Sequence, residues 1–257
     1  MTHPWFLGEE APRVLAHRGF VPPDSEQVVE NSVAALAAAR ATGTVYLESD
    51  CHVTADGDVI LFHDDDLRRV TGDPRPVATV RTRELVEIMS TRGGLAVLPD
   101  VLDAFPDARF NLDVKADAAA EPVGRLTARE SHRVLLTSFS DARRAAALTS
   151  ARGRGGEPAT SAGSRTLARV LAAVTARLPR LAARHLEGLD ALQIPERHRG
   201  IRILSPRLID AAHAAGVEVH VWTVDDPARM RHLWDMGVDG VVTDRTDVGV
   251  STRASRV

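Results

Sequence analysis

Four short groups of polar residues in the first half of the chain combine two histidines with several carboxylates. They are His17-Arg18-Gly19, Glu48-Ser49-Asp50, His63-Asp64 and Asp113-Val114-Lys115. Imidazole titrates close to neutral pH, so one histidine can act as a general base while the other, protonated, acts as a general acid. Carboxylates can hold a divalent cation, which stabilises charge on a phosphoryl group. The combination predicts a metal-assisted site that cleaves phosphodiesters.

Glu48 and Asp50 are two residues apart, a spacing that places both carboxylates on one face of a β-strand. Oxygen ligands of this kind favour Mg²⁺ or Ca²⁺ over zinc. Lys115 is the only lysine among the 32 Lys and Arg residues of the chain. Lysine and arginine differ in shape and hydration, so this single ammonium near carboxylates favours a functional role over chance retention at the surface.

The elements that must position these residues follow a repeating pattern. Short runs of Val, Ile and Leu alternate with alanine-rich helical stretches, which predicts an α/β fold and, at this length, a (β/α)₈ TIM barrel. The predicted strands are Arg13–Ala16, Thr44–Ser49, Asp58–Phe62, Arg109–Val114, Arg133–Ser138, Pro158–Ser161, Leu189–Ile194, Val217–Thr223 and Gly240–Thr243. One strand is surplus to a barrel. Asp56-Gly57 is a tight-turn signal, so Asp58–Phe62 is predicted to fold back as a hairpin on the strand before it.

The clearest predicted helices are Ser32–Ala41, Ser164–Leu186, Pro206–Ala215 and Pro227–Met236.

The candidate residues cluster where the predicted strands end. Chemistry in parallel α/β folds collects at the carboxyl ends of the strands. His17 and Asp244 follow the first and last strands, Glu48 and Asp50 end the second, Asp113 and Lys115 end Arg109–Val114, and Trp222 ends Val217–Thr223. We therefore predict that residues distant in sequence meet on one rim.

Length and composition limit the remaining possibilities. At 257 residues, the chain has the size of one barrel, and we expect residues 1–257 to form a single domain. A formal charge of −3 disfavours a nucleic-acid partner, and Cys51, the only cysteine, excludes an intramolecular disulfide. Met1 to Pro12 lack the features of a secretory signal, and no apolar run approaches the roughly 20 residues of a membrane span. We expect a cytoplasmic protein, with its oligomeric state left open.

The ordered set of motifs resembles the glycerophosphodiester phosphodiesterases, a branch of the phospholipase-C-like (β/α)₈ barrels. The resemblance extends from Ala16 to Asp247. Its landmarks are Ala16-His17-Arg18-Gly19, Glu30-Asn31-Ser32, Glu48 to Gly57, Leu61-Phe62-His63-Asp64, Asp113-Val114-Lys115, Trp222-Thr223-Val224-Asp225 and Gly237 to Asp244. Any one of these motifs is weak, whereas their order along the chain is specific.

The resemblance implies hydrolysis of a glycerophosphodiester, a small-molecule substrate, to sn-glycerol 3-phosphate and an alcohol. It also implies one divalent metal ion, Mg²⁺ or Ca²⁺, and an attack by the glycerol 2-hydroxyl that gives a cyclic phosphate first. The implied site residues are Glu48, Asp50 and Asp113 for the metal, His17 and His63 for acid–base catalysis, and Arg18, Lys115 and Trp222 for the phosphate and the glycerol carbons. Asp113 stands where the family usually has glutamate, which is one methylene longer.

Two alternative functions remain open. One is a phospholipase of the C or D type that acts on lipids with the same histidines; no apolar lip or interfacial helix is evident in the sequence, which disfavours it. The other is a catalytically silent barrel that binds phosphoryl ligands, although a binding module does not need an acid and a base together. Asp64 is interpreted as an orienting partner of His63 or as a helix cap, His52 as a supporting contact or a bystander, and Cys51 as buried packing.

Overall fold

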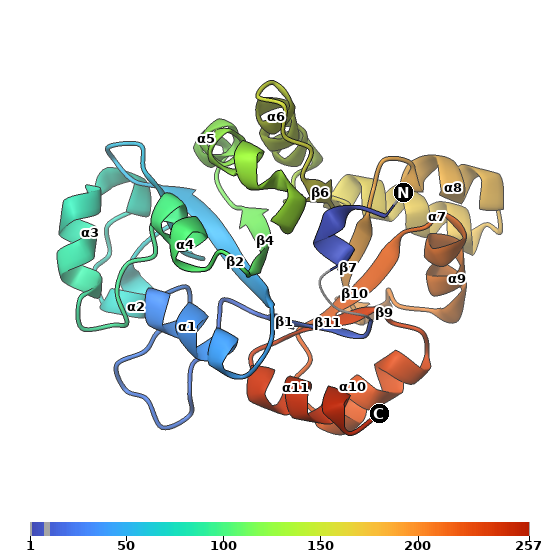
Figure 1. The fold of residues 1–257 in the computed structure, drawn as a ribbon. Helices are drawn as coiled ribbons and strands as arrows, with labels where there is room; N and C mark the ends of the chain where they lie inside the picture. The colour runs from blue at the N-terminus through green and yellow to red at the C-terminus, as the bar shows by residue number, and fades with distance from the viewer. Residues whose placement is uncertain (1, 8–10, 257) are drawn as a thin grey trace.

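Parallel strands alternate with helices around a closed sheet in the computed structural model, which describes residues 2–7 and 11–256 (Figure 1). The strands are β1 (Arg13–Ala16), β2 (Tyr46–Val53), β3 (Val59–Leu61), β4 (Arg109–Val114), β5 (Val134–Thr137), β6 (Ala159–Thr160), β7 (Ala191–Pro195), β8 (Arg197–His198), β9 (Ile201–Arg202), β10 (Glu218–Trp222) and β11 (Gly240–Thr243). The α-helices are α1 (Val33–Ala41), α2 (Arg68–Thr71), α3 (Thr82–Met89), α4 (Leu98–Ala104), α5 (Asp117–Thr127), α6 (Asp141–Arg152), α7 (Ser164–Thr175), α8 (Pro179–Leu186), α9 (Pro206–Ala214), α10 (Pro227–Asp235) and α11 (Thr246–Ala254). Short 3₁₀ helices are η1 (Pro4–Leu7), η2 (Val77–Thr79) and η3 (Ala128–Arg133).

The sheet has the connectivity of a (β/α)₈ barrel, as predicted. Its strand order is β6-β5-β4-β2-β1-β11-β10-β7, and neighbouring strands in this order run parallel. A parallel bridge between Ser161 and Ala191 joins the two ends of this order and closes the ring. The predicted hairpin is also confirmed, because β3 pairs antiparallel with β2. The carboxyl ends of eight strands therefore share one rim.

Two predicted elements differ from the structure by more than two residues at an end or are divided. β2 continues to Val53 because its last residues pair with β3, so Glu48 and Asp50 lie within the strand rather than at its end. The predicted helix Ser164–Leu186 is divided into α7 and α8. The break falls at Leu178-Pro179, since proline lacks an amide donor and disfavours helical geometry in the residue before it.

The amino ends of the strands are closed by a plug of aromatic side chains. Trp5 of η1 is fully buried and donates its indole N–H to the carbonyl of Phe110, 2.9 Å away. Its ring packs against those of Phe6 and Tyr46. Two larger apolar cores lie between the sheet and the surrounding helices. With one end of the barrel filled in this way, the carboxyl-end rim is left for chemistry.

A buried ion pair reinforces the closed end. Arg13 of β1 contacts both carboxylate oxygens of Glu218 on β10, at 2.9 and 2.8 Å, and also donates to the Tyr46 hydroxyl. His220 approaches the same carboxylate to 3.0 Å. Burial alone would raise the pKa of Glu218, but the hydrogen bonds and charges of Arg13 and His220 together outweigh it and lower the pKa from 4.5 to about 2. The carboxylate therefore favours the folded state whenever it is ionised.

We expect Glu218→Gln to lower the free energy of unfolding at neutral pH by about 2–4 kcal/mol, because it removes the negative charge that faces the buried Arg13 guanidinium. The folded-state pKa of Glu218 lies below its ordinary value, so the stabilisation is complete above pH of about 4.5 and is lost as pH falls toward about 2. Urea titrations over this pH range measure both effects. Glu121→Gln, which removes an exposed carboxylate, serves as the control and should change stability little.

No helix among the described residues is both long enough and apolar enough to cross a lipid bilayer.

Candidate functional site

A cavity of about 470 Å³ opens at the carboxyl ends of the strands. All eight residues predicted for the site line it, although β1, β2, β3, β4 and β10 supply them from far apart in the sequence. They are His17, Arg18, Glu48, Asp50, His63, Asp113, Lys115 and Trp222. Seven of them are within or just after a parallel strand that points at this rim, and the antiparallel β2–β3 hairpin returns His63 to the same rim.

The loop after β1 is held by contacts that its sequence makes possible. Arg18 has a φ of 56°, in the left-handed region, and in this conformation its backbone N–H donates to Glu48 Oε2 at 2.9 Å. Gly19 follows with a φ of 84°, and a Cβ there would lie 2.7 Å from the backbone carbon of Ala35. The loop can therefore pack against α1 only with glycine at this position, which fixes His17 and Arg18 over the cavity.

His17 and His63 are each paired with an aspartate through Nδ1. His17 Nδ1 lies 2.7 Å from Asp244 Oδ1, and His63 Nδ1 lies 2.7 Å from Asp64 Oδ1. Pairing at Nδ1 fixes the ring orientation and leaves Nε2 as the nitrogen for proton transfer. Burial disfavours the protonated form of His17, but the bond to Asp244 and the charge of Glu48 outweigh it and raise its pKa.

The aspartate partner of His63 was predicted, whereas that of His17 was not. Asp64 follows His63 directly in the sequence, so their contact could be proposed from the sequence. Asp244 is 227 residues from His17. The only signal for Asp244 in the sequence was its position after the last predicted strand. In the structure, the backbone N–H of Asp244 donates to Asp225 Oδ1 at 2.9 Å, which fixes this loop.

Three buried carboxylates lie on the floor of the cavity, with one ammonium among them. Lys115 Nζ is 2.9 Å from Asp50 Oδ1 and 2.6 Å from Asp113 Oδ2. Burial, followed by the charge of Asp50, raises the pKa of Glu48 to about 7. Burial also raises the pKa of Asp113, whereas Lys115 and Arg18 overcome burial and lower the pKa of Asp50. The site thus concentrates more negative charge than Lys115 alone balances.

The donor types of this floor fit a hard divalent cation. Asp113 Oδ1 and the neighbouring Asn111 Oδ1 are buried and have no hydrogen-bond partner among the described residues. Within that same part of the chain, no set of three or more His, Cys, Asp and Glu side chains is arranged around one point as metal ligands. The Lys115 ammonium bridges two of the carboxylates, Asp50 and Asp113. A cation held by Glu48, Asp50 and Asp113 would have to displace the lysine from these contacts.

Asn31 connects the loop before α1 to the carboxylates, and its role was not predicted. Its side-chain amide donates to Asp50 Oδ2 at 3.1 Å, and its carbonyl oxygen accepts from the hydroxyl of Ser49. Asn31 has a φ of 57°, a conformation that asparagine adopts more readily than most residues. The residue belongs to the motif Glu30-Asn31-Ser32, but no local spacing indicates its contact with β2.

His52 and Cys51 support the site without lining the cavity. His52 is buried, and its Nε2 lies 3.2 Å from the carbonyl oxygen of His63, so it holds the backbone that carries this histidine. Cys51 is fully buried, and burial raises the pKa of its thiol well above its ordinary value. This agrees with its interpretation as buried packing.

A chain of ion pairs links the two sides of the cavity. Arg69 of α2 contacts Asp64 Oδ2 and Glu30 Oε1, both at 2.6 Å. Glu30 in turn pairs with Arg18 at 2.8 Å, and Asp64 with His63. Arg69 itself does not line the cavity, yet it joins the partners of two residues that do. It is thus a positioning residue for Arg18 and His63.

We expect Arg69→Met to lower kcat/KM for a phosphodiester substrate roughly tenfold, since partners of this kind typically contribute 10- to 100-fold. Arg69→Lys should recover part of the activity, because an ammonium can still contact one of the two carboxylates. Arg75→Met is a matched control, since Arg75 also bridges two carboxylates, Asp73 and Glu84, but lies outside the cavity. Equal decreases in both Met variants would contradict the positioning role.

Apolar side chains form one wall of the cavity. Leu167 and Leu171 of α7 lie along it, with Ile203 beside β9. Phe139 packs edge-on against Trp222, with ring centroids 5.9 Å apart, and is 58% exposed. The structure differs here from the sequence-based expectation of no apolar lip. The lip is built from single residues of separate elements, and no continuous apolar segment marks it in the sequence.

Comparison with known proteins identifies the family. Residues 17–248 match the model of the glycerophosphoryl diester phosphodiesterase family. The chain is similar to a probable glycerophosphodiester phosphodiesterase 2 of Mycobacterium tuberculosis, with 36% identity over 246 residues that cover 95% of this chain and 91% of that protein. It is also similar to human lysophospholipase D GDPD1, with 25% identity over 90% of this chain and 82% of that protein.

Solved structures show the same fold. A glycerophosphodiester phosphodiesterase of Thermotoga maritima superimposes with a TM-score of 0.71 at 22% identity, covering 94% of this chain and 97% of that one. A phosphodiesterase of Oleispira antarctica, solved with the product sn-glycerol-3-phosphate, gives a TM-score of 0.70 at 23% identity and covers 95% and 97% of the two chains. The family match and the mycobacterial relative together show that the chain is a phosphodiesterase enzyme and belongs to the glycerophosphoryl diester phosphodiesterase family.

Proposed function

We propose that the enzyme hydrolyses glycerophosphodiesters to sn-glycerol 3-phosphate and an alcohol, with His17 and His63 as acid and base and with a divalent metal ion, Mg²⁺ or Ca²⁺. The observation that carries the proposal is that two Asp-oriented histidines share one cavity with three carboxylates and a lysine. This arrangement meets each demand of phosphodiester cleavage, namely a base, an acid and positive charge near the phosphate.

The residues divide these tasks as follows. Nε2 of one histidine removes a proton from the attacking hydroxyl, which forms a new P–O bond, while Nε2 of the other protonates the departing alcohol oxygen as the old P–O bond breaks. Arg18 and Lys115 hold the non-bridging oxygens, and Trp222 contacts the glycerol carbons. A divalent ion on Glu48, Asp50 and Asp113 would supply further positive charge at the phosphate. If the glycerol 2-hydroxyl attacks first, water opens the cyclic phosphate with the histidine roles reversed.

The test is release of glycerol 3-phosphate from a panel of diesters with different alcohols, measured with a coupled dehydrogenase. The enzyme is assayed after chelation and again with Mg²⁺, Ca²⁺ or Mn²⁺. Release that the metal restores supports the proposal. Absence of release with every metal and every diester would contradict it and favour the silent barrel.

The apolar wall favours a second candidate within the same chemistry, in which the glycerol of the diester carries an acyl chain and the released alcohol is the small head group. The human relative is named a lysophospholipase D, and Leu167, Leu171 and Phe139 offer apolar surface next to the phosphate-binding residues. Burying an additional methylene contributes about 0.8 kcal/mol, so the wall should distinguish diesters with an acyl chain from diesters without one.

We expect Leu167→Ser with Leu171→Ser to lower kcat/KM for a lysophospholipid by roughly tenfold, because the acyl chain then meets hydroxyl groups in place of apolar surface. Hydrolysis of glycerophosphoethanolamine should stay within about twofold of wild type, because this diester has no acyl chain to contact the wall. Ala172→Ser on the exposed side of α7 is the control. A parallel decrease on both substrates would remove the assignment of this wall to the acyl chain.

A further inference from the structure

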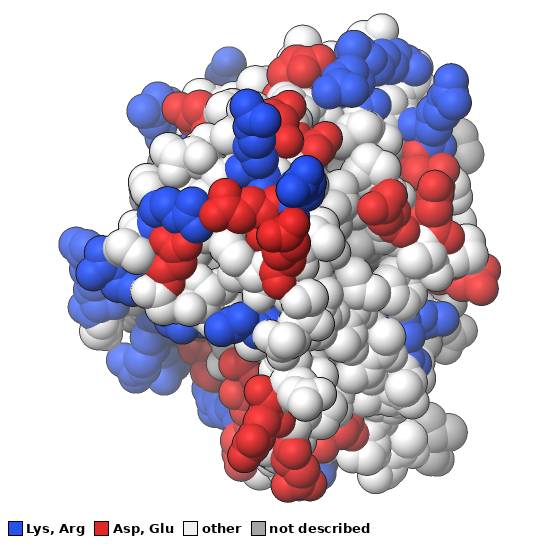
Figure 2. Space-filling view, turned by 90° about the vertical axis from the view of Figure 1, so that its left-hand side faces the viewer, with Lys and Arg blue, Asp and Glu red and all other residues white. Residues whose placement is uncertain are grey.

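Two segments that border the cavity are strongly basic and contain no acidic residue. They are residues 164–186, which form α7, α8 and their connecting turn, and residues 197–202, which form the β8–β9 hairpin; together we call them the basic rim. Its eight arginines are Arg165, Arg169, Arg177, Arg180, Arg184, Arg197, Arg199 and Arg202. The whole chain carries −3, so the rest of the sequence carries −11 once these eight charges are set aside. On the face formed by α1 to α3, in contrast, basic and acidic side chains are intermingled (Figure 2).

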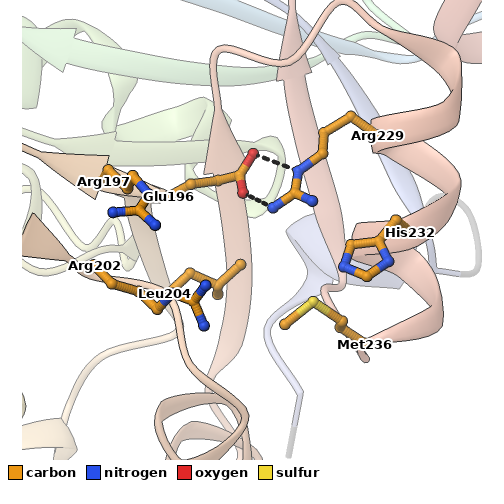
Figure 3. A pocket seen from close by; sticks show the side chains of 7 residues that line it. All are labelled: Glu196, Arg197, Arg202, Leu204, Arg229, His232 and Met236. Atoms are coloured by element: carbon orange, nitrogen blue, oxygen red, sulfur yellow. Dashed lines mark hydrogen bonds and ion pairs between the residues drawn. The ribbon is translucent and has the colours of Figure 1, made fainter. Parts of the chain in front are cut away.

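The charge of the basic rim is available to a partner. All eight arginine side chains are exposed, and in the part of the chain that the structure describes none forms an ion pair with a carboxylate. The carboxylate beside the hairpin, Glu196, is already paired with Arg229 of α10 (Figure 3). Arg197 and Arg202 line a cavity of about 320 Å³ next to this pair. Glu196 therefore forms its ion pair with Arg229, whose hydrogen bond lowers the pKa of Glu196, and its contribution to the hairpin is limited to the charge of Arg197, which also lowers this pKa.

Apolar side chains are exposed among these arginines. Leu178 and Leu181, at the start of α8, are 49% and 38% exposed, and Ile201 in the β8–β9 hairpin is 68% exposed. Arginine and leucine side by side are typical of surfaces that lie on a lipid interface, where the apolar groups enter the bilayer and the guanidinium groups meet lipid phosphates.

The basic rim is also next to the entrance of the active site. α7 supplies Leu167 and Leu171 to the cavity wall, and the hairpin region supplies His198 and Ile203. α7, α8 and β9 lie on the same side of the barrel (Figure 1). A surface held against the basic rim is therefore held beside the cavity.

We propose that the basic rim docks the enzyme on an anionic lipid bilayer, so that phosphodiesters derived from lipids reach the cavity from that surface. The substrate side of this inference rests on the proposed function, whereas the docking itself does not. A bilayer fits better than a nucleic acid, because exposed leucine and isoleucine contribute little to binding phosphates in water. The −11 carried by the rest of the chain also disfavours a polyanion that would wrap around it.

Co-sedimentation with vesicles of phosphatidylcholine, alone or mixed with phosphatidylglycerol, tests the docking. The wild type should bind only the anionic vesicles, and less as salt increases. The triple variant R177Q/R180Q/R184Q should need on the order of tenfold more anionic lipid for half-binding, and L178S/L181S/I201S should bind more weakly at every salt concentration. R81Q/R83Q/R129Q removes the same charge from exposed positions elsewhere and should bind within about twofold of wild type.

Each contrary outcome overturns the docking. Absence of wild-type binding to anionic vesicles does so, and so does an equally weakened control variant, which would show only general attraction between charges. The variant L178S/L181S/I201S could also bind anionic vesicles as well as the wild type, and heparin could abolish this binding. That result would assign the arginines to binding a soluble polyanion instead. Hydrolysis of water-soluble glycerophosphoethanolamine by each variant reports the proposed function separately, so that either idea can fail while the other stands.

Discussion

Replacing His17 or His63 by alanine should reduce kcat for a glycerophosphodiester by roughly 10²–10⁴-fold, the range expected when a general acid or base is removed. Both rings are held by an aspartate at Nδ1 and line the same cavity, whereas His198, which also lines it, has no carboxylate partner among the described residues. The double variant should be little worse than the poorer single variant, because the two groups act in one step. Steady-state rates together with thermal melts measure these effects.

His213→Ala is the matched control for these variants. His213 is also paired with an aspartate, Asp239, through a 2.8 Å contact, but it lies outside the cavity. Its replacement should leave kcat within about twofold of wild type. Full activity in both His17→Ala and His63→Ala, with intact folding, would exclude the acid–base roles.

Removal of divalent metal should produce the second large effect. We expect chelation to lower kcat by about 100-fold or more, and Asp113→Asn to do the same even with metal in excess. The physical reason is the charge of the floor, where burial raises the pKa of Glu48 and of Asp113, and Lys115 bridges Asp50 and Asp113. A divalent cation would relieve that repulsion.

Asp113→Glu refines this test. The longer side chain restores the carboxylate that the family usually has, so it should retain activity and change the order of preference among Mg²⁺, Ca²⁺ and Mn²⁺. Asp190→Asn is the control, because Asp190 is also a largely buried carboxylate but lies outside the cavity, where it accepts the backbone N–H of Thr160. Activity that survives exhaustive chelation in the wild type would remove the metal from the mechanism.

The barrel and the composition of its rim could be predicted from the sequence because both depend on local patterns. Apolar runs mark the strands, and β1, β4 and β11 begin and end as predicted. The candidate residues occur within or beside those runs, so the fold alone brings them together. The Asp56-Gly57 turn likewise predicts the β2–β3 hairpin.

The supporting contacts could not be predicted, because they join residues with no fixed spacing. Asp244, Asn31 and Arg69 each act through one side chain that crosses to another element. The apolar wall is similar, since its members belong to separate elements and become neighbours only in the folded chain. The division of Ser164–Leu186 into two helices had a visible signal in Pro179, which the alanine-rich pattern outweighed.

The most direct test of the proposed reaction is the position of bond cleavage in glycerophosphocholine, observed by ³¹P NMR with metal-loaded wild-type enzyme. We expect the diester resonance to be replaced by that of glycerol 3-phosphate, with free choline in equal amount and with a cyclic glycerol phosphate as a transient if the 2-hydroxyl attacks. Formation of phosphocholine and glycerol, or a diester resonance that persists with every metal, would contradict the proposed reaction at this site.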